Sequence, residues 1–225
     1  MNLPLQVYDF IAVLFPGVLL LGIVKREAPG LPIWNDGMQF GTLALLLVIG
    51  YLAGQLLAQI ARTIESEPTT SWLLQIGRRK RRRRGRLEGR LSSLRFTTQL
   101  NEAILSSLSD FYGRPVQPND PDLFNLAFSP VQDKMIKRDL FLALANMMRS
   151  LAVLGFFYGV YLAVEIVLSL VLKWQFDLYA IPLLVLSLLG YIFFRRGFLE
   201  YESIASKIPF LAFLAWYRQQ KMLKG

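Results

Sequence analysis

The stretch Gly41–Ile60, GTLALLLVIGYLAGQLLAQI, decides the fold class of this chain. It runs for twenty residues without a charged side chain. As an α-helix it is about 30 Å long, which matches the hydrocarbon thickness of a bilayer. Inside that layer every backbone N–H and C=O must bond within the segment, and a helix meets this demand. The stretch therefore predicts a transmembrane helix, and the chain is expected to be an integral membrane protein.

Three further apolar stretches are long enough to cross a membrane: Val7–Val24, Leu151–Leu172 and Leu178–Phe194. The whole chain of 225 residues is 54% hydrophobic with a mean hydropathy of +0.40, which soluble domains of this length rarely reach. Only five residues separate the last two stretches, so these helices should be antiparallel neighbours. The sequence predicts an all-α polytopic membrane protein with four transmembrane helices and a basic helical cytosolic cap.

The basic residues are strongly biased between the connections. Of 25 Lys and Arg residues, 22 lie either between Arg62 and Arg149 or after Phe194, and three lie in the two other connections. Cytoplasmic loops carry the excess of Lys and Arg in membrane proteins. The predicted location is therefore the bacterial inner membrane, with both termini in the cytoplasm.

The same charge pattern divides the chain into four parts. These are residues 1–64 with transmembrane helices 1 and 2, residues 65–148 as a cytosolic basic helical domain, residues 149–196 as a transmembrane hairpin of helices 3 and 4, and residues 197–225 as a cytosolic amphipathic tail.

The cytosolic part carries helical patterns. In Thr97–Tyr112, apolar residues recur at helical spacing (Leu100, Ile104, Leu108 and Phe111), and Gly113 with Pro115 should end this helix. Ser129-Pro130-Val131-Gln132 resembles a capping box that opens a helix continuing into the third span. The apolar segment Ile208–Trp216 in the tail is too short to span; it either lies on the inner leaflet or docks on the cytosolic cap.

Two of the predicted spans carry small residues at four-residue spacing. These seams are Gly50, Gly54 and Ala58 in the second span, and Gly155, Gly159 and Ala163 in the third. Small residues let helix backbones approach closely, within one chain or between the chains of a homo-oligomer. Gln55 and Gln59 border the first seam and can hydrogen-bond across it.

Two carboxylates fall inside the predicted spans. Asp9 lies near the start of the first, where it is either solvated at the interface or held inside the bundle. Glu165 lies eight residues before Lys173, which places it about 12 Å below the outer end of the third span. Either a tilted helix lets Glu165 reach the headgroups, or several copies of it form an outer ring that favours cations.

A run of seven consecutive basic residues follows the second span. Its members are Arg78, Arg79, Lys80, Arg81, Arg82, Arg83 and Arg84. Such a run binds anionic headgroups with about 1 kcal/mol per residue near the membrane surface. It also fits a role in topology alone. Nucleic acid or an acidic protein is the second choice of partner, since few aromatic side chains lie nearby for base stacking.

Several kinds of chemistry are absent from the sequence. The chain has no Cys and no His, which excludes thiol nucleophiles, disulfides and imidazole acid–base catalysis. It also lacks a Gly-rich phosphate loop and a nucleophile elbow. We expect no catalytic residues, no metal and no cofactor, and do not predict an enzyme.

Short motifs in the first sixty residues resemble a known group. Tyr8-Asp9-Phe10 with Pro16-Gly17, and then Gly50-Tyr51 with Gly54, are similar to the YDF…PG and GYxxG spans of small bacterial membrane proteins of anti-phage defence operons. This resemblance implies an oligomer in the inner membrane that works with a cytosolic protein partner.

The leading functional hypothesis is an oligomeric inner-membrane component of a bacterial defence system. It would sense or respond to its partner and alter membrane packing or permeability. A passive scaffold that anchors a soluble effector explains the same sequence, and a small channel or transporter subunit is a further alternative.

Overall fold

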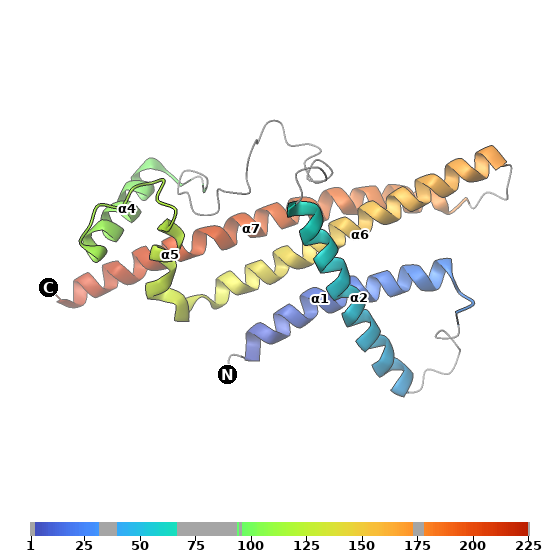
Figure 1. Ribbon diagram of the computed structural model, residues 1–225, viewed down its shortest axis with the longest axis horizontal. Helices are drawn as coiled ribbons and strands as arrows, with labels where there is room; N and C mark the ends of the chain where they lie inside the picture. The colour runs from blue at the N-terminus through green and yellow to red at the C-terminus, as the bar shows by residue number, and fades with distance from the viewer. Residues whose placement is uncertain (1–2, 32–39, 67–93, 95, 173–177, 225) are drawn as a thin grey trace. The chain divides into compact units, whose positions relative to one another are not determined.

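In the computed structural model every described element is a helix (Figure 1). The structure describes residues 3–31, 40–66, 94, 96–172 and 178–224. Its elements are α1 (Leu3–Glu27), α2 (Phe40–Ser66), α4 (Thr98–Tyr112), α5 (Leu123–Phe128), the 3₁₀ helix η3 (Ser129–Lys134), α6 (Ile136–Leu172) and α7 (Ala180–Lys224). The predicted all-α class is confirmed for these residues.

The chain forms two compact units. Unit 1 comprises Met1–Gln75 and Ala143–Glu200, and unit 2 comprises Ile76–Leu142 and Tyr201–Gly225. The two long helices α6 and α7 contribute residues to both units.

In unit 1, α1 and α2 cross at glycine residues (Figure 1). A methyl group added at Gly17 would lie 1.7 Å from the carbonyl oxygen of Gly50, and one at Gly54 would lie 2.0 Å from that of Val13. Only glycine allows two helix backbones to come this close. Pro16, next to the crossing, is fully buried and remains within α1.

Helices α6 and α7 pack against each other through a second set of small residues. An added methyl group at Gly155 would lie 3.2 Å from the Ser187 carbonyl oxygen, and one at Gly197 would lie 3.4 Å from the side chain of Met148. The Ser187 hydroxyl donates a hydrogen bond of 2.5 Å to the Gly155 carbonyl oxygen. Residue numbers rise along one helix as they fall along the other, so the predicted antiparallel pairing is present.

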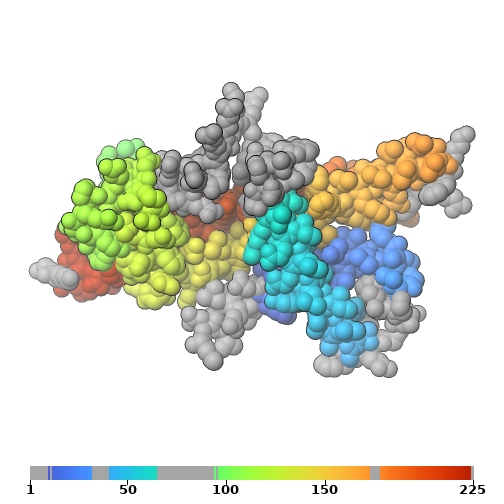
Figure 2. All heavy atoms as spheres, in the orientation of Figure 1, coloured from blue at the N-terminus to red at the C-terminus, as the bar shows by residue number. Residues whose placement is uncertain are grey.

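A small apolar cluster joins α2 to α6 in unit 1. It contains Leu57 and Ala61 from α2 with Val153 and Leu154 from α6, and Leu20 and Ile23 of α1 pack against it. In Figure 2, α2 lies on the visible face of unit 1. Three helices therefore share this cluster.

Unit 2 has its own core, built from α4, α5, η3 and the last part of α7. Its fully enclosed side chains include Ile104, Leu108, Leu123, Phe210 and Phe213. Thr97 caps α4 by accepting a hydrogen bond from the backbone N–H of Leu100. Gly113, at φ 63°, ends the helix in the left-handed region that favours glycine. The predicted helix and its end are confirmed.

The predicted start of the helix that continues into the third span is wrong. Ser129 is not the N-cap of a long α-helix, because a 3₁₀ helix with no side-chain cap occupies Ser129–Lys134 and α6 begins only at Ile136. Val131 adopts a non-helical backbone there and directs its side chain into the core instead. From Ile136 onward, α6 does continue through the predicted third span.

The tail is not a separate helix. Residues 197–224 continue α7 without a break from Ala180, and Pro209 is accommodated inside it. Of the two alternatives for Ile208–Trp216, docking on the helical cap is the one present, since Phe210, Phe213 and Leu214 are buried in the unit 2 core.

Three described helices are long and apolar enough to cross a membrane: Gly41–Ile64, Ile136–Leu172 and Ala180–Leu223. The surfaces of these helices that do not pack within the chain carry many exposed large apolar side chains, among them Leu56 and Leu170 at 67% and 68% exposure. Exposing such surfaces to water costs free energy, whereas exposing them to lipid tails does not. By length and composition, these helices are those of a membrane protein.

Candidate functional site

The most distinctive polar group in unit 1 joins the end of α1 to the middle of α6. The Tyr158 hydroxyl donates to Oε1 of Glu27 at 2.8 Å and accepts from Nη1 of Arg26 at 2.6 Å. The Tyr161 hydroxyl donates to Oε2 of Glu27 at 3.2 Å. Arg26 and Glu27 are also ion-paired at 3.5 Å. We call these four residues the α1–α6 polar cluster.

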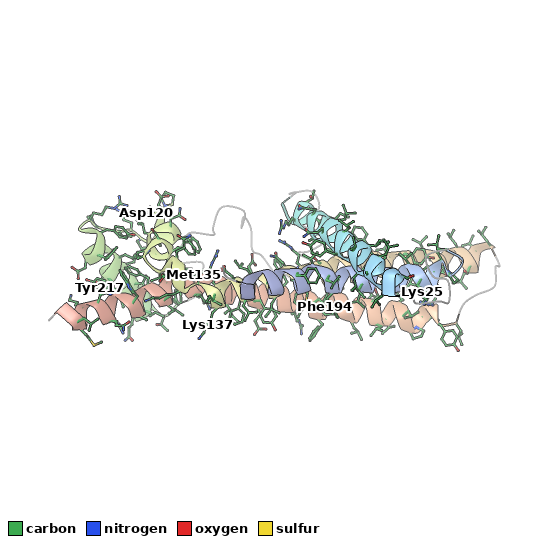
Figure 3. The ribbon with its side chains drawn as sticks, turned by 90° about the horizontal axis from the view of Figure 1, so that it is seen from below. Lys25, Asp120, Met135, Lys137, Phe194 and Tyr217 are labelled. Carbon is green, nitrogen blue, oxygen red and sulfur yellow. The ribbon has the colours of Figure 1, made fainter. Side chains whose placement is uncertain are left out.

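Local helix geometry explains why these side chains meet. Tyr158 and Tyr161 are three residues apart on α6 and therefore share one face. Arg26 lies in the last turn of α1, where a cation complements the helix dipole. Figure 3 labels Lys25 in that same turn. The cluster is partly open to its surroundings, with the side chains of Arg26 and Glu27 37% and 25% exposed.

Sequence reasoning missed this cluster. The signal was present as a charged triplet, Lys25-Arg26-Glu27, directly after the first apolar stretch, and as two tyrosines at helical spacing in the third. Neither feature indicates the other, because 131 residues separate Glu27 from Tyr158.

Of the two predicted intramembrane carboxylates, the structure describes the side chain of only one. Glu165 lies on α6 one helical turn after Tyr161, and its side chain is half-buried. Because of this spacing, it lies on the same helix face as the two tyrosines. Asp9 falls within the backbone of α1, but its side chain is outside the described part of the chain.

The two predicted glutamines do not act as a pair. The Gln55 side chain donates to the Tyr51 hydroxyl at 2.9 Å, and the Tyr51 ring stacks on Phe10 of α1 at 5.3 Å. Gln59 is exposed, and its backbone carbonyl oxygen accepts from Thr63. Only Gln55 therefore contributes to the region where α1 and α2 meet.

Both predicted small-residue seams lie against helices of the same chain. Gly50 and Gly54 face α1, and Ala58 beside them is buried. Gly155 and Gly159 face Ser187 of α7. Ala163 is half-buried further along α6. Glycines already in contact within one chain leave little room for a second copy on the same faces.

The basic run Arg78–Arg84 lies outside the described residues. Two other arginines, one on α6 and one on α7, lie within the described residues. Arg149 donates to the Asn146 side chain at 2.8 Å and lies over the Phe198 ring at 5.7 Å. Arg195 is 9% exposed and donates to the Tyr191 hydroxyl at 3.4 Å.

Unit 2 has a smaller polar group on its surface. The Tyr217 hydroxyl donates a hydrogen bond to the carboxylate of Asp110, and the Lys221 ammonium lies 3.2 Å from the same oxygen. The Tyr217 hydrogen bond, followed by Lys221, lowers the pKa of Asp110 below its ordinary value of 3.8. This group ties α4 to the last turns of α7.

None of these arrangements, all of them within the described residues, gathers the carboxylates of a metal site. Among the described residues no three Asp or Glu side chains gather as a cation site would require. Comparison with protein-family models, curated proteins and solved structures finds no match to this chain.

Proposed function

We propose that this protein is an oligomeric component of the bacterial inner membrane with four transmembrane segments and both termini in the cytoplasm. Unit 2 and the basic run Arg78–Arg84 would lie in the cytoplasm, where the run contacts anionic lipid or an acidic partner. The resemblance of the first sixty residues suggests that the protein acts in a defence system.

The observation that carries this proposal is that α6 and α7 each belong to both units. Each helix supplies apolar length sufficient to cross a membrane and also contributes residues to unit 2. Phe210 and Phe213, for example, are core residues of unit 2 and belong to the helix that carries Ser187 in unit 1. A partner that binds unit 2 therefore acts on helices that also form the membrane unit.

This arrangement favours a signalling role over catalysis. A shift of a long helix by one or two ångströms is a common response at such interfaces. The bundle would then change its packing or open a path for ions. Because the two glycine seams already pack within the chain, neighbouring copies would meet through the exposed apolar faces of the spans.

The first test is the mass of the protein solubilised in a mild detergent. We expect a complex of several chains, each of 25.7 kDa. A monomer would exclude a pore formed between copies, because one four-helix chain leaves no room for a central channel.

The second test measures potassium flux from vesicles of phosphatidylethanolamine and phosphatidylglycerol that contain the protein. Flux is measured without additions and with cytosol from phage-infected or uninfected bacteria. We expect flux that rises only with cytosol from infected cells. Vesicles that stay tight in every condition would exclude conduction and leave the passive scaffold.

A further inference from the structure

The charged end of α1 lies beside the middle of the apolar stretch of α6 rather than beside its outer end. Glu27 is bonded to Tyr158 and Tyr161. Tyr161 precedes Leu172, the last residue of α6, by eleven residues, and Tyr158 precedes it by fourteen. At helical rise these separations are about 16 and 21 Å. The α1–α6 polar cluster is therefore deep within the predicted third span, Leu151–Leu172.

Charges at such a depth are costly in a hydrocarbon environment. An ionised Lys, Arg or Asp at the centre of a spanning helix opposes insertion of that helix. Three consecutive charged residues, Lys25 to Glu27, end α1 at this level. The ion pair and the tyrosine hydroxyls contact Arg26 and Glu27, and these two side chains are 37% and 25% exposed. A polar environment would stabilise the charged atoms in this exposed part.

A line of polar residues leads from the cluster to the outer end of α6. Tyr158, Tyr161, Glu165 and Ser169 follow one another at spacings of three, four and four residues. These spacings place all four on one face of the helix. The residues between them are otherwise apolar, and Val160 on another face is 45% exposed. A helix face of this kind is suited to water on one side of the helix and lipid on the other.

We infer that water enters the outer half of unit 1 along this polar face and reaches Tyr158, about two thirds of the way through the third span. This inference takes from the proposed function only the membrane orientation, that is, which end of α6 faces the outside of the cell. It assigns Glu27, Tyr161 and Glu165 to a hydrated path that starts at the outer surface. In a conducting state this path would be the outer entrance for small hydrophilic ions.

Cysteine accessibility tests the path directly, because the chain has no natural Cys. The variants Tyr161→Cys and Glu165→Cys place a thiol on the polar face. Val160→Cys is the matched control at the same depth on another face, and Leu178→Cys, at a 74% exposed position before α7, marks the outer end. The full-length variants are treated in intact spheroplasts with a membrane-impermeant, positively charged methanethiosulfonate.

We expect both polar-face thiols to react at least about tenfold faster than Val160→Cys, because only a hydrated thiol ionises to the reactive thiolate. Glu165→Cys removes none of the hydrogen bonds of the cluster, so it gives a reading even if Tyr161→Cys folds poorly.

Polar-face thiols that react as slowly as Val160→Cys, while Leu178→Cys reacts, would overturn the path and leave the proposed function standing. Equal fast reaction of Val160→Cys would also overturn it, because that segment would then lie outside the membrane. A Leu178→Cys that reacts only in inside-out vesicles would overturn the proposed orientation. The rate ratio measured in those vesicles would then decide the path separately.

Discussion

At the scale of single residues, the glycines of α1 and α2 decide how these helices meet. Gly17 and Gly54 each have a carbonyl oxygen of the other helix where a Cβ atom would be. The spacing of Gly50 and Gly54 could be read from the sequence as a face for close packing. The position of Gly17 opposite them could not be read from the sequence, because the residues of one helix do not indicate which other helix packs against it.

The variant Gly54→Ala tests this crossing. The added methyl group would lie 2.0 Å from the Val13 carbonyl oxygen, which forces the helices apart. Overpacking of this kind costs about 1–3 kcal/mol, so the midpoint of thermal unfolding in detergent should fall by several degrees.

Gly22→Ala is the matched control on α1, since no atom lies within 4 Å of the position that its methyl group would take. Its midpoint should be unchanged or slightly raised, because alanine is the better helix former. Equal midpoints for Gly54→Ala and Gly22→Ala would contradict the close crossing.

Asp110 offers a prediction about pH. Its pKa is lowered by Tyr217 and Lys221, so its carboxylate stabilises unit 2 in full above the ordinary value of 3.8. That contribution disappears as the pH falls through the lower folded-state pKa. Asp110→Asn should therefore have a lower thermal midpoint than the natural protein near neutral pH, and the difference should vanish in strong acid.

Thermal midpoints measured from neutral pH into strong acid, well below the ordinary pKa of 3.8, check this, with Glu102→Gln as the control at an exposed position of the same helix. A difference between Asp110→Asn and the natural protein that persists unchanged in strong acid would show that ionisation is not its cause.

At the scale of elements, α7 is the helix whose role differs most from its sequence pattern. The charged residues after Phe194 suggested that a span ended there and a separate tail began. The backbone instead continues as one helix from Ala180 to Lys224. The unit 2 core explains why, since Phe210 and Phe213 gain buried contacts only if the helix extends that far.

Phe210→Ala tests this docking. The Phe210 ring is fully buried and lies edge-on to Phe96 and Phe124, at 6.3 and 6.2 Å. Removing it should cost about 3–5 kcal/mol. Amide hydrogens of α4, which packs on the same core, should then exchange much faster with solvent.

Leu211→Ala removes a neighbouring side chain that is 43% exposed and should leave the exchange of α4 nearly unchanged. If α4 exchanged equally fast in both variants, the last part of α7 would not be holding unit 2 together.

At the scale of the whole molecule, the distribution of Lys and Arg predicts which side of the membrane each part occupies. Met222 is 79% exposed near the end of α7, and Leu178 precedes the start of that helix. A thiol in Met222→Cys should resist an impermeant maleimide in intact spheroplasts and react after permeabilisation. Labelling of Met222→Cys from outside would reverse the proposed orientation.

The sequence by itself determined the helical class, the apolar stretches, the small-residue faces and the end of α4 at Gly113. Each of these depends on residues close together in the chain, through helix periodicity, side-chain size or backbone conformation. The membrane class followed in the same way, because a span is a local property of about twenty residues.

The tertiary structure alone decided which faces meet. It placed Gly17 against Gly50 and Gly54, inserted Phe210 and Phe213 into the unit 2 core, and brought Glu27 to Tyr158 and Tyr161. The physical reason is that each pairing joins residues far apart in sequence. Packing and hydrogen bonding can select such partners only after the helices have formed.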